Sequence, residues 1–142
     1  MGRMNARKTL GMAVAISSLL ICGAGASTHS LPNIPICGGG KRITCVVDGD
    51  TIWIEGEKIR IQGFNTPEVQ GQCRREKELA KRATRELQAI LSSGPITITR
   101  TGKDRYKRTL ATIRNSSGDI TNLMIAKGVA HEWRGRREGW CG

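Results

Sequence analysis

The chain has 142 residues and a formal net charge of +11, from 23 Lys and Arg against 12 Asp and Glu. This length suits one domain with a hydrophobic core and excludes two. The positive charge favours polyanionic partners, with nucleic acid first among them, although charge alone does not exclude an anionic lipid surface.

Residues 1–26 have the pattern of a secretory signal peptide. A basic start is followed by an apolar run at 10–21, which is too short to span a bilayer comfortably, and by the small residues Ala24, Gly25 and Ala26 at a cleavage site. An uncleaved membrane anchor is the alternative. We therefore expect a secreted or periplasmic monomer with no stable membrane association after the signal is cleaved.

The rest of the chain alternates between strand-like and helix-like patterns. In the segment 58–62, Ile59 and Ile61 share one face while Arg60 lies on the other. A longer segment carries apolar side chains at helical spacing and ends before Gly94 and Pro95. The expected elements are a leader at 27–41 that begins with mobile residues, strands at 42–47, 51–54 and 58–62, a helix at 72–91, strands at 96–100 and 109–114, a turn at 115–119 and a helix at 120–127.

This order of elements predicts an α+β, mainly β domain at 42–142. It is compatible with a small closed barrel of about five strands with one long and one short helix, the architecture of the OB-fold.

Four cysteines follow the expected cleavage site: Cys37, Cys45, Cys73 and Cys141. An even number in a small exported domain indicates two disulfides, and three connectivities are possible. We favour Cys37–Cys45, because the three glycines between them can turn the chain sharply. This choice leaves Cys73–Cys141.

Residues that could bind a metal ion or a phosphate are concentrated between Val46 and Glu68. Asp48, Asp50, Asn65 and Glu68 offer oxygen ligands that suit a hard divalent cation. Arg60 offers a planar fork of donors that suits phosphate. With the D-R-Y-K-R sequence at 104–108, these residues indicate a metal-assisted site that cleaves phosphodiesters.

The D-G-D-T sequence at 48–51, the T-P-E sequence at 66–68 and the arginine between them resemble the thermonuclease (staphylococcal nuclease-like) family. The resemblance runs from about residue 43 to about residue 133. It implies an OB-fold and a calcium-dependent nuclease that hydrolyses phosphodiester bonds of DNA, with RNA as a second candidate substrate. Little sequence specificity is expected, because phosphate contacts carry little base information.

The resemblance also implies a role for each residue of the site. One calcium ion would be bound directly by Asp50, with Asp48 acting through water, and the oxygens of Asn65 and Thr66 are the further expected ligands. Arg60 and Arg108 would clamp the phosphate oxygens, and Glu68 would activate water. Arg105 and Tyr106 are the expected substrate-binding residues, because a cation can pair with phosphate and an aromatic ring can stack on a base.

Two positions depart from the family pattern. Asn65 stands where the family usually has a carboxylate, which predicts weaker metal binding or a degraded site. Lys107 stands where glycine is common, and a left-handed turn there would strain a lysine and affect Arg108. The alternative function is therefore a catalytically weakened OB-fold module that binds nucleic acid. A third alternative is an exported surface-binding protein that retains only remnants of the motif.

Overall fold

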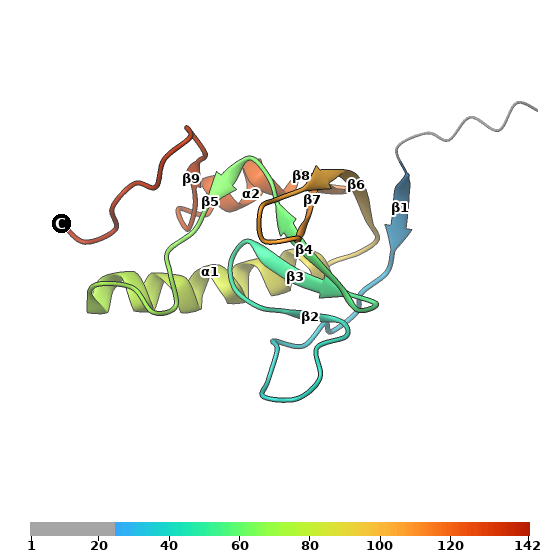
Figure 1. The fold of residues 1–142 in the computed structure, drawn as a ribbon, viewed down its shortest axis with the longest axis horizontal. Coiled ribbons are helices and arrows are strands. Elements are labelled where there is room, and N and C mark those ends of the chain that lie inside the picture. Colours follow the sequence, from blue (N-terminus) through green and yellow to red (C-terminus); the bar gives the residue numbers. More distant parts are fainter. Residues whose placement is uncertain (1–24) are drawn as a thin grey trace, which may run out of the picture.

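The computed structural model describes residues 25–142. The expected signal peptide therefore lies outside the described residues, except for Gly25 and Ala26. In the described part of the chain no helix has the length and apolar character needed to cross a membrane. The elements are β1 (Ala26–His29), β2 (Cys45–Val46), β3 (Thr51–Ile54), β4 (Glu57–Ile61), β5 (Phe64–Asn65), α1 (Arg74–Ser92), β6 (Ile96–Lys103), β7 (Thr109–Asn115), β8 (Gly118–Asp119), α2 (Ile120–Ala126) and β9 (His131–Glu132) (Figure 1).

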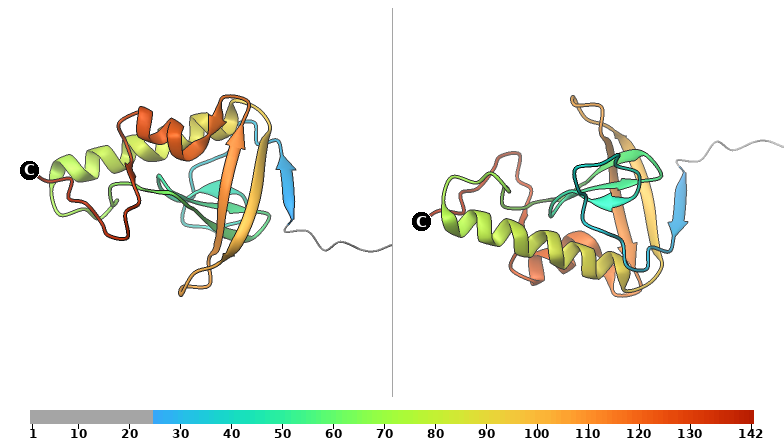
Figure 2. Two further views of the ribbon diagram at one scale, coloured as in Figure 1. Left: turned by 90° about the horizontal axis from the view of Figure 1, so that it is seen from above. Right: turned by 90° about the horizontal axis from the view of Figure 1, so that it is seen from below.

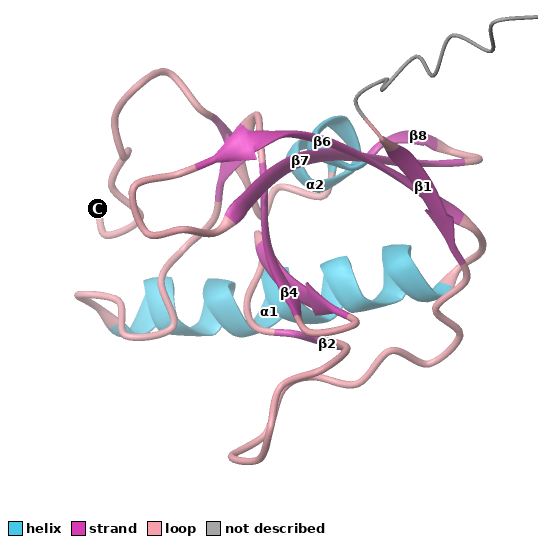
Figure 3. Ribbon diagram, turned by 45° about the vertical axis from the view of Figure 1, so that its right-hand side comes forward, coloured by secondary structure: helices cyan, strands magenta, loops and turns pink. Residues whose placement is uncertain are grey.

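The strands form a curled sheet in the order β1-β6-β7-β4-β3-β2, with β8 added at β7. β4 and β7 pair in parallel, with Arg60 opposite Leu110, while the other pairs in this sheet are antiparallel. The sheet curves over α1 (Figure 3), and α1 and α2 lie side by side (Figure 2). A separate pair, β5 with β9, joins the middle of the chain to its C-terminal part. The predicted α+β, mainly β, OB-like fold with one long and one short helix is confirmed.

The core lies between the concave face of the sheet and the two helices. In β4, Ile59 and Ile61 are fully buried while Arg60 is only partly buried, as the two-residue period of a strand requires. In α1, Ala83, Leu87 and Leu91 recur at helical spacing and are also fully buried. Each element is therefore amphipathic with the period of its own backbone.

Helix α1 begins two residues later than predicted, at Arg74. Cys73 is its N-cap, and the Cys73 sulfur accepts a hydrogen bond from the Glu76 N–H at 3.4 Å. A side chain that accepts from the third helical residue is the usual function of an N-cap. This contact fixes the start of the helix, which a count of apolar positions cannot locate.

The first part of the leader expected at 27–41 is packed against the domain, and the mobility expected for its first residues is wrong, whereas residues 38–41 are exposed. Ala26–His29 form β1, which pairs antiparallel with β6, and Ile34 is only 2% exposed. Arg100 donates to the Ser27 hydroxyl at 2.8 Å. By contrast, the strand expected at 42–47 is confined to Cys45–Val46.

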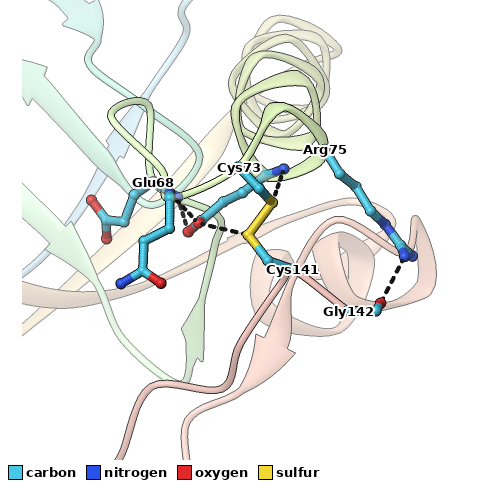
Figure 4. Close-up of a disulfide and its surroundings, with 7 residues drawn as sticks. Glu68, Cys73, Arg75, Cys141 and Gly142 are labelled. Carbon is cyan, nitrogen blue, oxygen red and sulfur yellow. Dashed lines mark hydrogen bonds between the residues drawn. A yellow bond between two sulfur atoms is a disulfide. The ribbon is translucent and has the colours of Figure 1, made fainter.

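Both favoured disulfides are present, Cys37–Cys45 and Cys73–Cys141. The second bridge attaches the C-terminal tail, which we define as residues 133–142, to the start of α1 (Figure 4). Arg75 also donates to the backbone oxygen of Gly142 at 3.1 Å. The tail is therefore fixed beside the N-terminus of α1.

We expect the two disulfides to differ in their contribution to stability. Replacing Cys37 and Cys45 by serine opens a loop of 8 residues, and replacing Cys73 and Cys141 opens one of 68. Loop-closure entropy predicts losses in the free energy of unfolding of about 2.5 and about 4 kcal/mol, respectively. Urea denaturation of the two double variants measures the difference. A larger loss for the Cys37 and Cys45 pair would contradict the entropic explanation.

Candidate functional site

The D-G-D turn between β2 and β3 packs tightly against its surroundings. A side-chain carbon at Gly49 would lie 2.7 Å from Cβ of Ala83 in α1 and 2.8 Å from Cγ2 of Thr66. Glycine at this position therefore allows the turn to approach both the helix and the T-P-E segment. The backbone N–H of Asp50 donates to the Asp48 carboxylate at 3.1 Å, which holds the two aspartates side by side.

The Asp50 carboxylate joins three parts of the motif that are distant in the sequence. It accepts hydrogen bonds from the hydroxyls of Thr51, at 2.9 Å, and Thr66, at 3.1 Å. The Arg60 guanidinium lies 3.1 Å from Oδ2, the same oxygen that accepts from Thr66. Thr51 pairs with Arg60 across the β3–β4 hairpin, so the strand register itself places Arg60 beside Asp50. The structure thus brings D-G-D-T, Arg60 and T-P-E into one cluster.

Arg60 is also bonded to the chain that follows its own strand. Its guanidinium donates to the carbonyl of Phe64 at 3.0 Å and to the carbonyl of Ile61. These bonds orient the arginine away from the buried isoleucines of β4, as predicted. They also hold the curve of the chain that leads to Asn65 and Thr66, both of which are buried.

Burial raises the pKa of the Asp48 carboxyl, and the negative charge of Asp50 raises it further, to about 7. The more distant charge of Glu68 acts in the same direction. The negative charges of Asp50 and Glu68 thus disfavour ionisation of Asp48, and a cation beside Asp48 would relieve that repulsion. The carboxylate, amide and carbonyl oxygens of Asp48, Asp50, Asn65 and Thr66 are ligands that suit calcium, so the residues present fit this ion.

We expect the metal-free protein to lose stability as the pH rises from about 4 to about 7, because of Asp48. Its folded-state pKa of about 7 lies above the ordinary value of 3.8. The protonated form therefore stabilises the fold at low pH, and this contribution is lost as the pH rises through the folded-state value. In the natural protein, Asp48 should lower the free energy of unfolding by more than about 1 kcal/mol between pH 4 and pH 8. The Asp48→Asn variant should lack this decrease. Denaturation of both proteins in chelator measures it, and parallel pH profiles would contradict the assignment.

The loop between β6 and β7 carries the other predicted arginine. The Asp104 carboxylate accepts from the backbone N–H groups of Tyr106 and Arg108 at 2.9 and 3.0 Å, and from Nε of Arg108 at 2.7 Å. Lys107 has φ of 63°, so the left-handed turn expected at this position is present in spite of the lysine. Asp104 thus fixes the direction of Arg108.

The substrate-binding pair Arg105 and Tyr106 lies at the tip of this loop. Tyr106 is 63% exposed, and the guanidinium carbons of Arg105 and Arg108 lie 4.8 and 5.4 Å from the centre of its ring. Arg108 directly precedes β7, two residues before Leu110, the partner of Arg60, so the loop begins near the strand that carries Arg60. Within residues 25–142, no hydrogen bond or ion pair joins Arg108 to the Asp50 cluster.

Glu68 is exposed and lies between the Asp50 cluster and the C-terminal tail. Its carboxylate forms an ion pair with Arg137. Arg137 belongs to the C-terminal tail, which the Cys73–Cys141 bridge brings to Glu68. The sequence gives no signal for a contact of this kind.

Sequence reasoning also missed Glu76, in the first turn of α1. One oxygen of its carboxylate accepts the backbone N–H of Glu68 at 3.2 Å, and the other accepts that of Gln72 at 2.8 Å. The available signal was a glutamate three residues after the helix N-cap, the pattern of a capping box. With Cys73 in the place of the usual serine or threonine, this pattern is easily overlooked.

The side chains of Cys73, Glu76 and Cys141 lie within 4.8 Å of one another, a spacing that could hold a metal ion. The two sulfurs are bonded to each other, however, and a disulfide lacks the thiolate charge that binds metals. Of the sites in the described chain, the oxygen-rich cluster around Asp50 therefore suits calcium better.

The fold is that of a nuclease-like domain, and the model of the staphylococcal nuclease homologue family matches residues 58–139. The chain belongs to this family. The match includes Arg60, Glu68 and Arg108, and it begins after Asp48 and Asp50.

Among curated proteins, the chain is 33% identical over 129 residues to the succinoglycan biosynthesis protein ExoI of Rhizobium meliloti (strain 1021). The alignment covers 87% of this chain and 62% of that protein. The chain thus spans less than two thirds of the length of this relative.

Proposed function

We propose that the protein is a calcium-dependent nuclease of low sequence specificity that hydrolyses phosphodiester bonds of DNA, with RNA as a second candidate substrate. Membership of the family supports a nuclease-like or nucleic-acid-binding function in general. The observation that supports catalysis is the Asp50 carboxylate, which is shared by Arg60, Thr51 and Thr66. Acidic oxygens therefore lie beside a guanidinium that could bind phosphate, in one largely buried cluster.

In this proposal each residue performs one task. Asp50, Asn65 and the Thr66 carbonyl hold one calcium ion, with Asp48 acting through water. Bound calcium would supply electrostatic stabilisation of the phosphate charge. Arg60 and Arg108 donate to the non-bridging oxygens, where charge develops during attack. Glu68 accepts the proton of the attacking water, whose oxygen forms the new bond to phosphorus as the bond to the leaving oxygen breaks.

Arg60 is proposed to couple the binding of metal and substrate. In the structure its guanidinium neutralises Asp50, which reduces the charge available to a cation. A bound phosphate offers Arg60 a second anionic partner and thereby releases part of the Asp50 charge. We therefore expect calcium and nucleic acid to strengthen each other's binding, as linkage requires.

We propose that the protein acts outside the cytoplasm, secreted or in the periplasm. Two disulfides support an oxidising compartment. The signal-like pattern at residues 1–26 is in agreement with this location.

The second candidate function is a nucleic-acid-binding module with weakened catalysis. Asn65 favours it, because a neutral ligand holds calcium less well than a carboxylate. The ion pair between Arg137 and Glu68 favours it too, because a base held by a cation is less available to water.

Turnover across a calcium series separates the two candidates. We expect the natural protein to cleave single-stranded DNA, with a half-maximal calcium concentration that falls at least about tenfold in the Asn65→Asp variant, because a charged ligand replaces a neutral one. A chelator control should abolish cleavage by both proteins. Cleavage only by the Asn65→Asp variant would favour the binding module instead.

The same assay should include succinoglycan. The relative's name connects that protein with succinoglycan biosynthesis. Turnover of succinoglycan in place of nucleic acid would contradict the proposed substrate.

A further inference from the structure

Glu76 is a charged residue that is almost fully buried, with 8% of its surface exposed. Buried carboxylates are rare unless hydrogen bonds or opposite charges compensate them. Both of its oxygens accept backbone N–H groups, from Glu68 and Gln72. The Cys141 sulfur lies 3.7 Å from Oε2, so the Cys73–Cys141 bridge covers the carboxylate.

These bonds extend beyond ordinary helix capping. In a capping box the glutamate accepts the N–H of the N-cap residue, which here is Cys73. Glu76 instead reaches Gln72, one residue earlier, and Glu68, five residues before the N-cap. The carboxylate therefore holds the segment that carries Glu68, as well as the end of its own helix.

Gly71 shows how closely this segment wraps around Glu76. A side-chain carbon at Gly71 would lie 2.5 Å from Cγ of Glu76. The N–H of Gly71 donates to the carbonyl of Glu68 at 2.9 Å, which closes a tight turn at 68–71. The turn is thus fixed by one internal hydrogen bond and by one bond to a buried charge.

We propose, on the basis of the proposed role of Glu68 as the base, that Glu76 is a positioning residue that sets the place of Glu68 relative to the Asp50 cluster. A hydrogen bond to an ionised acceptor is about twice as strong as a neutral one. The disulfide excludes water from the carboxylate and so removes a competitor for this bond. A misplacement of about 1 Å in a catalytic group can lower turnover by about 100-fold.

The Glu76→Gln variant tests the role with little change in volume. Its amide keeps one acceptor oxygen and directs an NH2 group at the other backbone N–H, so the longer bond, to Glu68, is the one expected to break. We expect amide exchange at Glu68 to quicken at least about tenfold. We also expect kcat to fall about 10- to 100-fold, with KM and DNA affinity within about twofold of those of the natural protein.

Two further variants control this result. Glu78→Gln removes the same charge from an exposed position of α1 and should change neither amide exchange at Glu68 nor kcat. Gly71→Ala pushes the turn away while the carboxylate remains, and it should reproduce the effect of Glu76→Gln. It keeps the test decisive even if Glu76→Gln does not fold.

A double-mutant cycle with Glu68→Gln shows whether Glu76 acts through Glu68. Once Glu68 cannot accept a proton, Glu76→Gln should cause no further loss of kcat. An equal loss in both backgrounds would overturn the proposal, as would unchanged exchange at the Glu68 amide. If the natural protein cleaves no DNA, the proposed function fails, while amide exchange still decides whether Glu76 positions the turn.

Discussion

Replacing Asp50 by asparagine should abolish turnover at every calcium concentration while the protein still binds DNA at low salt. The substitution keeps one of the two oxygens that accept from the hydroxyls of Thr51 and Thr66, and it removes the one direct carboxylate ligand of the proposed set. Electrostatic stabilisation by a metal is worth several kcal/mol, so we expect a loss of at least about 100- to 1000-fold.

The proper control for Asp50→Asn is Glu55→Gln. Glu55 is exposed in the β3–β4 turn, so its neutralisation changes net charge by the same amount. Single-turnover cleavage and filter binding, with each protein at matched salt, separate catalysis from affinity. Substantial cleavage by Asp50→Asn would show that the metal, if one is needed, binds elsewhere.

Replacing Arg60 by lysine should lower turnover about 100- to 1000-fold, the effect expected when a preorganised donor to the transition state is lost. Lysine keeps a positive charge beside Asp50, so folding should be retained, but it lacks the planar fork that matches phosphate. Arg60→Ala is a poorer test, because it would leave the buried Asp50 without its ion-pair partner. Arg108→Ala should cause a loss of the same order.

Arg136→Ala is the matched control for the arginine variants. Arg136 is exposed in the C-terminal tail, and its loss should reduce mainly DNA affinity and the steepness of its salt dependence. Measurements of kcat and of DNA affinity at several salt concentrations distinguish the two effects. If Arg136→Ala lowered kcat as much as Arg60→Lys, the proposed site would be wrong.

The sequence predicted the parts of the structure that depend on local pattern. The strand at β3, the amphipathic faces of β4 and α1, and the short helix α2 follow from periodicity over a few residues. The disulfide Cys37–Cys45 follows from a short glycine-rich loop between its cysteines. The left-handed conformation at Lys107 followed from the family resemblance together with the known cost of such a turn.

Contacts between distant segments could not be predicted in this way. β1 pairs with β6, which lies about seventy residues later in the chain. The sequence of β1 is polar and lacks the alternation of apolar and polar residues that predicts a strand. The contact of Arg137 with Glu68 exists because a disulfide fixes the tail, and Glu76 is buried because that same bridge covers it. The places of these residues depend on tertiary packing. Their polar and charged side chains, judged from the sequence alone, indicate exposed residues.

The presence of β1 affects whether copies of the domain associate with one another. This strand covers the free edge of β6 along residues 96–99. Cleavage after Ala26 would remove only the pairing of Ala26 with Thr99 and leave the rest of the strand in place. β1 is itself an edge strand, but it is short and polar, with 4 residues. A protein trimmed beyond His29 would have β6, with 8 residues, as its edge strand, and a longer open edge is a better template for pairing between molecules. Retention of β1 would therefore protect the domain against aggregation.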